Sequence, residues 1–316
     1  MADTKVIAVV GATGAQGSGL VRAILADPQG GFAVRAVTRD PNTPAAKALA
    51  AAGAEVVAAD VDDVESLKRA FAGCYGAYCV TFFWAHFSPE KELAQARGMA
   101  AAAKAAGLKH VIWSTLEDTR TLVPLSDDRM PTLQGKYKVP HFDAKGEADQ
   151  YFRDAGVPTT FLVASFYWDN FIHFGSGPKK GPDGDYLLTL PMGAQKMAGI
   201  AAADIGKCAY GIFKAGGTYI GQTVGVAGEH LTGDEMAAAM TRAIGKPVRY
   251  NPVSAATFRS FGFPGADDLG NMFQIYEEFA APLNATRDVA RTKSLNPALQ
   301  DFNTWLAGNA SRIPLD

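Results

Sequence analysis

The chain has 316 residues, of which 48% are hydrophobic and 20% charged, and its formal net charge is −2. This balance argues against a protein that binds nucleic acid directly through a basic surface. The sequence shows no secretion-type leader and no apolar run of the ~18 residues that cross a bilayer, so we expect a cytoplasmic protein without a membrane partner. The three cysteines lack metal-type spacing, which predicts reduced thiols and no metal site.

The most informative segment is Lys5–Gly17, in which a β-branched run is followed by glycines at 11, 14 and 17. An apolar helical pattern then continues through Leu25. A strand, a tight glycine turn and a helix start form a site for a dinucleotide pyrophosphate, because backbone N–H groups and the helix dipole face the anion. The spacing G-x-x-G-x-x-G differs from the standard G-x-G-x-x-G fingerprint, and an ordinary turn is the alternative.

The first half of the chain alternates strand and helix patterns, which predicts an α/β fold with a doubly wound, Rossmann-like parallel sheet. The predicted strands are Val6–Val10, Phe32–Thr38, Glu55–Ala59, Gly76–Phe82, His110–Ser114 and Thr159–Val163. The predicted helices between them are Gly17–Ala26, Pro44–Ala52, Asp63–Ala72, Pro89–Ala106 and His141–Ala155. Glycines directly after several of these helices suit the left-handed residue that ends a helix.

Beyond Ala164 the pattern loosens and indicates a smaller α+β domain. Its predicted strands are Tyr186–Leu190, Lys196–Gly199 and Thr223–Val226, and its predicted helices are Thr232–Ile244, Ala255–Phe261, Asp267–Phe279 and Pro297–Ala307. We therefore expect an NADP-binding domain over residues 1–157, to which later strands return, and a substrate or partner domain over residues 158–316.

The end of the second strand predicts which dinucleotide binds. An acidic residue there holds the ribose 2′-hydroxyl of NAD, whereas arginine accommodates the 2′-phosphate of NADP. Here the strand ends in Thr38-Arg39, which favours NADP(H), although Asp40 follows directly. Asp60 and Val61, after the third strand, are expected to border the adenine, with a helix N-cap as the alternative role for Asp60.

The helix that opens at Pro140 places His141 and Lys145 one turn apart on one face. The chain resembles the NmrA-like family of atypical short-chain dehydrogenase/reductases over nearly its whole length. The resemblance is carried by Gly11–Gly17, Val37–Arg39, His141–Glu147, Tyr151–Pro158, Asp183–Pro191 and Gly262–Phe273.

Ordinary members of the wider superfamily reduce carbonyls with a Tyr-x-x-x-Lys pair, and the resemblance places His141 at the tyrosine position. Imidazole, with an ordinary pKa near 6.5, is a poor substitute for a phenol near 10, and an adjacent ammonium disfavours its protonated form. The resemblance implies that Lys145 anchors the nicotinamide ribose and that Ser114 is a helper serine. A solvated lysine and a helix-start histidine without chemistry are the alternatives.

Aromatic clusters at 82–87 and 166–174 follow two strand ends and are expected to face the nicotinamide, with inter-domain packing as the alternative. The long segment 116–139 is interpreted as a mobile flap over the cofactor. The predicted catalytic residues are Lys145, His141 and Ser114. The predicted cofactor-binding residues are Gly11, Thr13, Gly14, Gln16, Gly17, Thr38, Arg39, Asp60, Val61, Thr81, Phe82, Lys145, Phe166 and Asn170.

The missing tyrosine beside an intact glycine loop makes an NADP(H)-binding redox sensor the first functional hypothesis. In it, the NADPH/NADP ratio shifts the conformation and a regulatory protein partner reads the result. The alternative is an NADPH-dependent reductase of a quinone, enone or other apolar carbonyl or imine substrate. Cofactor-assisted chemistry without redox is a third hypothesis, and the sequence leaves a homodimer open.

Overall fold

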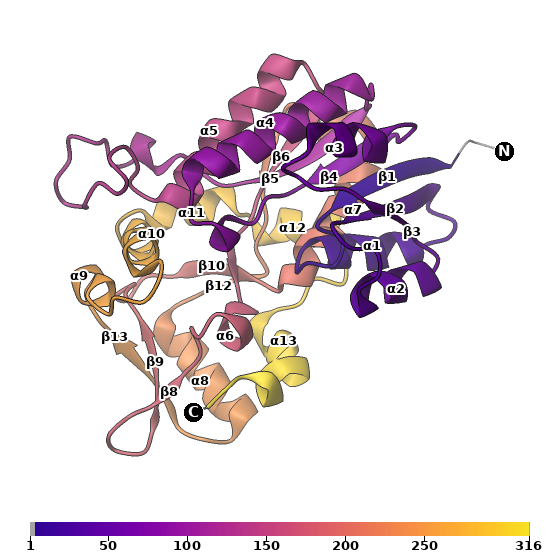
Figure 1. Cartoon of the computed structure of the whole chain (residues 1–316). Helices are drawn as coiled ribbons and strands as arrows, with labels where there is room; N and C mark the ends of the chain where they lie inside the picture. The colour runs from indigo at the N-terminus through magenta and orange to yellow at the C-terminus, as the bar shows by residue number, and fades with distance from the viewer. Residues whose placement is uncertain (1–3, 316) are drawn as a thin grey trace.

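The computed structural model describes residues 4–315, and a seven-stranded parallel sheet lies at its centre (Figure 1). The sheet order is β11-β6-β5-β4-β1-β2-β3. These strands are β1 (Lys5–Val10), β2 (Phe32–Thr38), β3 (Glu55–Ala58), β4 (Gly76–Cys79), β5 (His110–Thr115), β6 (Thr159–Val163) and β11 (Thr223–Gly225). The order reverses between β1 and β4, so the crevice that binds ligands in such folds is expected beside the ends of these two strands. The predicted α/β, Rossmann-like fold class is confirmed.

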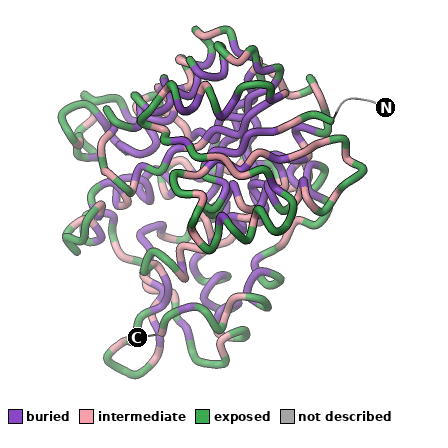
Figure 2. Tube along the Cα trace, turned by 45° about the vertical axis from the view of Figure 1, so that its right-hand side comes forward, coloured by how far each residue is buried: buried purple, intermediate pink, exposed green. Residues whose placement is uncertain are grey.

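Helices cover both faces of this sheet. One face carries α3 (Val64–Phe71), α4 (Pro89–Ala105) and α5 (Pro140–Ala155), and the other carries α1 (Gly17–Leu25) and α7 (Ala202–Lys214), with α2 (Pro44–Ala51) at β2 and β3. Successive side chains of β1 point to opposite faces of the sheet, which explains the two layers. Ala8 and Val10 belong to the core under α3, α4 and α5, and Ile7 and Val9 belong to the core under α1 and α7. Figure 2 shows the buried residues concentrated along these strands.

Glycines set the close crossing of α1 and α7. A Cβ at Gly206 would overlap the backbone nitrogen of Leu20 and the carbonyl oxygen of Gln16. A Cβ at Gly19 would lie 2.9 Å from the carbonyl carbon of Ala203. The two helices therefore pack backbone against backbone, and this contact fixes α1 directly behind the glycine loop.

One further helix, α12 (Val289–Leu295), packs on α7, and its Leu295 belongs to the core of the sheet domain. The other elements form a second unit with its own core. Its sheets have the orders β12-β10-β7 and β13-β9-β8. Its strands are β7 (Phe166–Tyr167), β8 (Lys179–Lys180), β9 (Tyr186–Leu190), β10 (Met197–Ile200), β12 (Glu229–Leu231) and β13 (Val248–Pro252). Its helices are α6 (Asn170–His173), α8 (Gly233–Ile244), α9 (Ala255–Arg259), α10 (Ala266–Glu278), α11 (Ala280–Thr286) and α13 (Phe302–Asn309). Short 3₁₀ turns lie at Phe83–Ala85, Thr119–Thr121, Gly216–Tyr219 and Ala310–Arg312.

Two strands of the main sheet, β6 and β11, come after residue 157. The division of the chain at 157 stays a prediction, and these strands show where the second half returns to the first. Between residues 4 and 315, no helix combines the length and apolar character that crossing a bilayer requires.

One predicted helix has the wrong start, because the last long helix begins at Phe302 rather than at Pro297. The second half also contains elements that were not predicted, namely β7, β8, β12, β13, α6, α7, α11 and α12. The start of α13 is set by Asp301, whose carboxylate accepts the N–H of Thr304 at 2.7 Å. An N-cap of this kind satisfies a helix-end donor, so the helix starts there.

The interpretation of segment 116–139 as a mobile flap stays a prediction, but buried polar contacts hold parts of this segment in place. The buried carboxylate of Asp143 accepts N–H groups of Thr119, Lys138 and Val139 at 2.7 to 3.1 Å. The Lys138 ammonium, itself fully buried, donates to two carbonyls of the same segment, and Asn271 of α10 donates to the carbonyls of Pro131 and Lys138. Both ends and the middle of the segment are therefore anchored by buried polar contacts.

The buried His110 gives the protein a predictable acid sensitivity. Its Nε2 lies 2.9 Å from the Thr160 hydroxyl, while its Nδ1 is buried without a partner among the described residues. Burial lowers the pKa of His110 to about 4. The unfolded chain, with an ordinary pKa near 6.5, binds more protons between these values, so stability falls as the pH drops through that window.

Because of His110, we expect the free energy of unfolding to decrease by about 2 kcal/mol between pH 6.5 and pH 5. Urea unfolding of the wild type and of His110→Gln at pH 7, 6 and 5 measures this, and the stability difference between the proteins should shrink or reverse toward acid. Burial raises the pKa of Asp149 to about 6, which makes an opposite contribution to the pH dependence of stability. Because both proteins contain Asp149, the comparison cancels this contribution. A stability difference that does not change with pH would contradict the assignment.

Candidate functional site

The glycine loop connects β1 to α1 and has the geometry of an anion cradle. Gly11 has φ 65°, a left-handed conformation that glycine adopts without strain. A Cβ at Gly17 would overlap the carbonyl oxygen of Gly11 and lie 2.9 Å from its carbonyl carbon. Within residues 4–315, the backbone N–H groups of Thr13, Ala15 and Gly17 donate to no other group. Free donors at a helix start without acidic neighbours fit a diphosphate.

The end of β2 leaves one cation open to a ligand. Arg39 is exposed, and within the described part of the chain it forms no ion pair or hydrogen bond. The neighbouring Asp40 accepts the N–H of Asn42 at 2.8 Å, so that carboxylate is engaged in its own turn. Thr38 is half-buried beside them. Arg39 is therefore free to pair with a phosphate in the manner that the sequence predicts.

The residues after β3 lie at the surface. Asp60 is exposed and its carboxylate accepts the N–H of Asp62 at 3.0 Å, while Val61 is half-buried. The N-cap of α3 is Asp63 instead, which accepts the N–H groups of Glu65 and Ser66. The alternative role of Asp60 as the helix cap is therefore wrong, and its contact with adenine stays a prediction.

Gln16 and Ser114, both predicted site residues, meet in a buried polar network. The Gln16 side-chain oxygen accepts the hydroxyls of Tyr78 and of Ser114, the latter at 2.9 Å, and its amide donates to Tyr167. Burial raises the pKa of both phenols, that of Tyr167 to about 12, so both remain hydroxyl groups. Ser114 is thus turned toward the loop, and its hydroxyl contacts neither Lys145 nor His141. These hydrogen bonds connect Gln16 of the glycine loop to β4, β5 and β7.

Lys145 lies at the end of β4 in a buried cluster. Its ammonium lies 2.6 Å from the carboxylate of Glu92 and donates to the hydroxyl of Thr81, which also bonds Glu92. The side chain of Glu92 is fully buried and that of Lys145 is 11% exposed. The alternative of a solvated helix lysine is therefore wrong. A buried ion pair of this kind fixes the ammonium in place, because either charge alone is costly in the interior.

The second oxygen of Glu92 faces His86. Glu92 Oε2 and His86 Nε2 lie 3.5 Å apart, and both are buried without a hydrogen-bond partner among residues 4–315. The N–H of Ser88 donates to His86 Nδ1, which leaves the proton of the neutral ring on Nε2, toward Glu92. Burial lowers the pKa of His86 and keeps this ring neutral.

His141 lies one turn before Lys145 and has a charged partner from the second unit. Its Nδ1 is 2.6 Å from Oδ1 of Asp268, and its backbone N–H donates to Oδ2 at 3.2 Å. The ring also packs against Trp84 and Phe83, with centroids 4.7 and 5.9 Å away. His141 and Lys145 therefore both lie against the segment that follows β4.

The remaining predicted residues divide between the surface and the core. Phe82 is 57% exposed beside the buried Thr81, so its side chain is open to a ligand. Phe166 packs against Phe171 and Phe273 in the core of the second unit, which supports packing as the role of this ring. Asn170 is half-buried at the start of α6, and its role stays a prediction.

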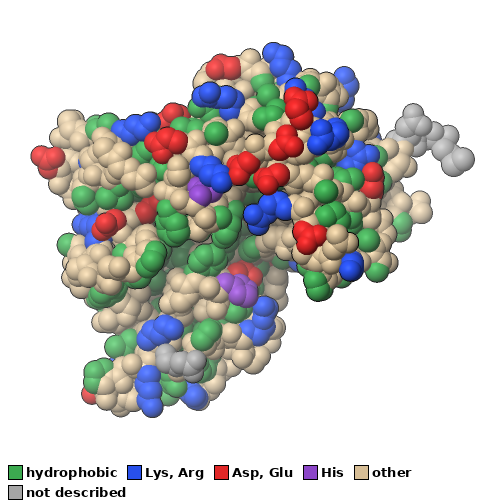
Figure 3. Space-filling model, viewed as in Figure 1, with side chains coloured by type: hydrophobic (Ala, Val, Ile, Leu, Met, Phe, Trp, Pro, Cys, Tyr) green, Lys and Arg blue, Asp and Glu red, His purple; other side chains and the backbone are tan. Residues whose placement is uncertain are grey.

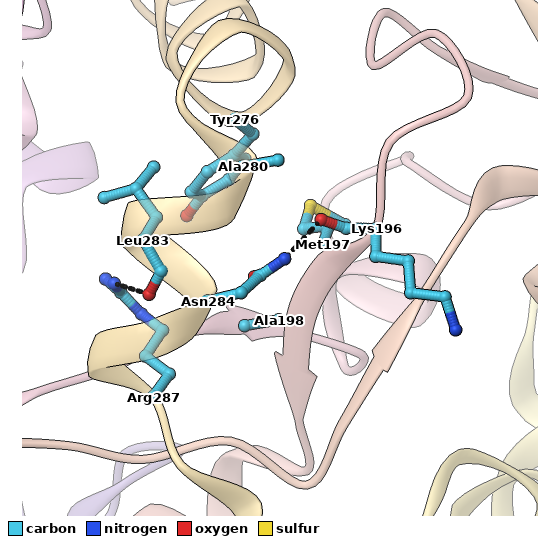
Figure 4. Close-up of a pocket in the computed structure, with 8 residues that line it drawn as sticks. All are labelled: Lys196, Met197, Ala198, Tyr276, Ala280, Leu283, Asn284 and Arg287. Carbon is cyan, nitrogen blue, oxygen red and sulfur yellow. Dashed lines mark hydrogen bonds between the residues drawn. The ribbon is translucent and has the colours of Figure 1, made fainter.

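The surface is hollowed between the sheet domain and the second unit, and hydrophobic side chains gather in this hollow (Figure 3). A separate depression lies between β10 and α11 (Figure 4). Met197, Tyr276 and Arg287 line it, and the space between them is too narrow to hold a water molecule. Arg287 is instead structural, because it forms a two-bond ion pair with Glu117 at 2.6 and 2.8 Å. This depression is therefore no ligand site.

Sequence reasoning missed Glu92 and Asp268, which neutralise or orient the two predicted side chains. Asp268 lies in the segment Gly262–Phe273, which carries part of the family resemblance, but the sequence predicted no role for it. Glu92 had only a weak signal: an acidic residue in the first turn of α4, where such residues also favour the helix dipole.

Comparison with known proteins agrees with this geometry. A model of the NmrA-like family matches residues 3–306. The NmrA-like family domain-containing oxidoreductase FrzB of Cladobotryum sp. is 31% identical over 295 residues, which cover 85% of this chain and 83% of FrzB. The structure of NmrA, a negative transcriptional regulator, in complex with NADP has a TM-score of 0.80 and 24% identity, covering 98% of this chain and 96% of NmrA. The Citrobacter sp. triphenylmethane reductase complexed with NADP(H) has a TM-score of 0.75 and 21% identity, covering 96% of this chain and 99% of the reductase. The chain belongs to the NmrA-like family.

Proposed function

We propose that this protein binds NADP(H) and is an NADPH-dependent reductase of apolar carbonyl, quinone or enone compounds. The free N–H groups of the glycine loop and the free Arg39 would hold the diphosphate and the 2′-phosphate. NADPH, when bound, supplies a hydride. Two structural neighbours form complexes with NADP or NADP(H), and the relative FrzB is an oxidoreductase by name, which supports this proposal.

The observation that carries the reductase proposal is the arrangement of Lys145 and His141. Both are buried at the end of β4, and each is fixed by a carboxylate within 2.6 Å. A solvated lysine or an exposed helix-start histidine needs no such partner. Two oriented proton-bearing groups beside the aromatic segment after β4 suit the reduction of an apolar substrate, in which the substrate oxygen gains a proton as its carbon gains a hydride.

The test combines affinity with turnover. Calorimetric titration of NADPH, NADP and NADH should show the two phosphorylated dinucleotides binding at least about tenfold more tightly than NADH, since they alone carry a phosphate for Arg39. Nicotinamide absorbance then follows NADPH consumption with quinones, aryl enones and cyclic imines at high protein concentration. Tight binding without consumption across the whole panel would contradict the reductase.

A redox sensor is the second proposal, and the fold shared with the regulator NmrA supports it. We further propose that the chain resembles a human NADPH-sensing member of the family, which would favour a sensor. The anchored segment 116–139 is a poor moving part, so a sensor would need a shift between the sheet domain and the second unit. Hydrogen exchange of the apo, NADP and NADPH forms distinguishes the proposals: different protection in NADPH and NADP, without turnover, supports a sensor. A regulatory partner, a homodimer and a cytoplasmic location stay predictions.

A further inference from the structure

The contact between Asp268 and His141 fixes where the proton of the imidazole lies. A carboxylate only accepts hydrogen bonds, so the 2.6 Å contact from Asp268 Oδ1 requires a proton on His141 Nδ1. The second carboxylate oxygen accepts the backbone N–H of the same residue, which prevents the carboxylate from turning away. In the neutral ring, Nε2 is therefore left unprotonated, and in the charged ring Nε2 carries the transferable proton.

The other ring nitrogen of His141 is free. Nε2 forms no hydrogen bond with any described residue and keeps some solvent exposure, although the side chain as a whole is only 8% exposed. The ring is bordered by the aromatic faces of Trp84 and Phe83. A flat apolar molecule packed on these rings would meet one polar atom, Nε2.

The approach of Asp268 depends on a glycine that the fold requires. Gly265 caps α10 with φ 87°, and a Cβ there would lie 2.9 Å from the Trp84 ring. The start of α10 therefore packs directly on the aromatic segment after β4, which brings the carboxylate of its first turn to His141. The second unit thus contributes a charged group to a site that the sheet domain builds.

We propose that Asp268 is a positioning residue that holds His141 so that Nε2 donates a proton to the substrate during reduction. This inference rests on the proposed reductase function. The carbonyl carbon takes up a hydride with its electron pair from NADPH, and the carbonyl oxygen takes up the Nε2 proton. The carbon–oxygen π bond breaks, C–H and O–H bonds form, and the products are an alcohol and NADP. His141 is left as the Nδ1–H tautomer bound to Asp268 and regains its second proton from solvent at Nε2.

The carboxylate of Asp268 lies 2.6 Å from Nδ1 and holds the ring in one orientation. The ammonium of Lys145 is paired separately with Glu92. Each of the two side chains therefore has its own carboxylate partner.

The decisive variant is Asp268→Asn. The amide oxygen must stay on the backbone N–H of His141, since an amide N–H there would face another donor. The amide N–H₂ then faces Nδ1, so the proton of the neutral ring moves to Nε2 and Nδ1 can no longer be protonated as well. Donation from Nε2 would then leave an imidazolate anion, so this ring cannot replace the doubly protonated donor. Asp267→Asn is the matched control, because Asp267 is exposed in the same first turn of α10 and keeps the same helix-dipole contribution.

Two measurements test the proposal. Long-range ¹⁵N NMR of histidine-labelled protein, with His141→Gln for assignment, should show the Nδ1–H tautomer in the wild type and in Asp267→Asn, and Nε2–H in Asp268→Asn. Turnover of a quinone or aryl enone should fall by about a hundredfold or more in kcat for Asp268→Asn, while KM for NADPH stays within about twofold.

An Nε2–H tautomer in the wild type would overturn the proposal. So would an unchanged kcat in Asp268→Asn once its tautomer has switched, because Asp268 would then be only structural. If the wild type reduces no acceptor, the reductase function fails and the role of Asp268 fails with it. That result is distinguishable from turnover that survives both Asp268→Asn and His141→Gln.

Discussion

Replacing Gly17 by alanine should weaken NADPH binding by at least about a hundredfold, which corresponds to roughly 2.7 kcal/mol. The added Cβ would overlap the Gly11 carbonyl, and both colliding groups are backbone, so no side chain can move aside. Relief requires the loop to open, which turns its N–H groups away from the diphosphate. Calorimetric titration of NADPH measures the loss directly.

Two glycines provide the controls for this prediction. A Cβ at Gly308 would have no other atom within 4 Å, so Gly308→Ala should bind NADPH like the wild type. Gly14 is intermediate, because its Cβ would lie 3.1 Å from the Gly11 carbonyl oxygen, and Gly14→Ala should lose less affinity than Gly17→Ala. Thermal unfolding checks that each variant is folded. A folded Gly17→Ala protein with wild-type affinity would show that the diphosphate does not lie on this loop.

Reversing the charge at Arg39 should invert the choice of dinucleotide. In Arg39→Glu, NADPH loses a charge-assisted pair and meets repulsion, so its affinity should fall by about a hundredfold or more. NADH carries a ribose hydroxyl there, which a carboxylate can accept, so its affinity should stay the same or rise several-fold. Arg39→Ala should weaken NADPH by about tenfold to a hundredfold and leave NADH unchanged.

The competition between the two dinucleotides makes this prediction independent of stability. A general loss of folding lowers both affinities together, whereas the 2′-phosphate affects only one. Arg312→Glu, at another exposed arginine, is the charge-matched control and should keep the wild-type preference. Equal losses of NADPH and NADH in Arg39→Glu would contradict the role of Arg39, and retained NADPH affinity would place the phosphate elsewhere.

The helices of the second half show the limit of prediction from sequence. Helix α7 contains Gly206 and Gly211, which lower its helix propensity, so local sequence patterns do not predict this helix. In the fold both glycines are required, since a Cβ at Gly211 would overlap the Leu295 carbonyl and one at Gly206 would overlap α1. Tertiary packing here outweighs a local preference of about 1 kcal/mol per glycine.

The candidate site divides in the same way. The helix spacing that puts His141 and Lys145 on one face is local, so the sequence predicted it. Their carboxylate partners are not local: Asp268 lies 127 residues after His141, and the fold alone brings them to 2.6 Å. Ser114 was predicted beside the reacting groups but bonds Gln16 instead, because strand β5 places it behind the glycine loop.

The sequence by itself determined the alternating α/β order, the glycine turn and the arginine after the second strand. Each of these depends on residues close together in the chain, where propensity, periodicity and turn chemistry act directly. Only the tertiary structure decided which buried charges neutralise one another and which helices cross backbone to backbone. Those contacts depend on the elimination of water between distant segments, and a buried charge selects its partner only after the core has formed.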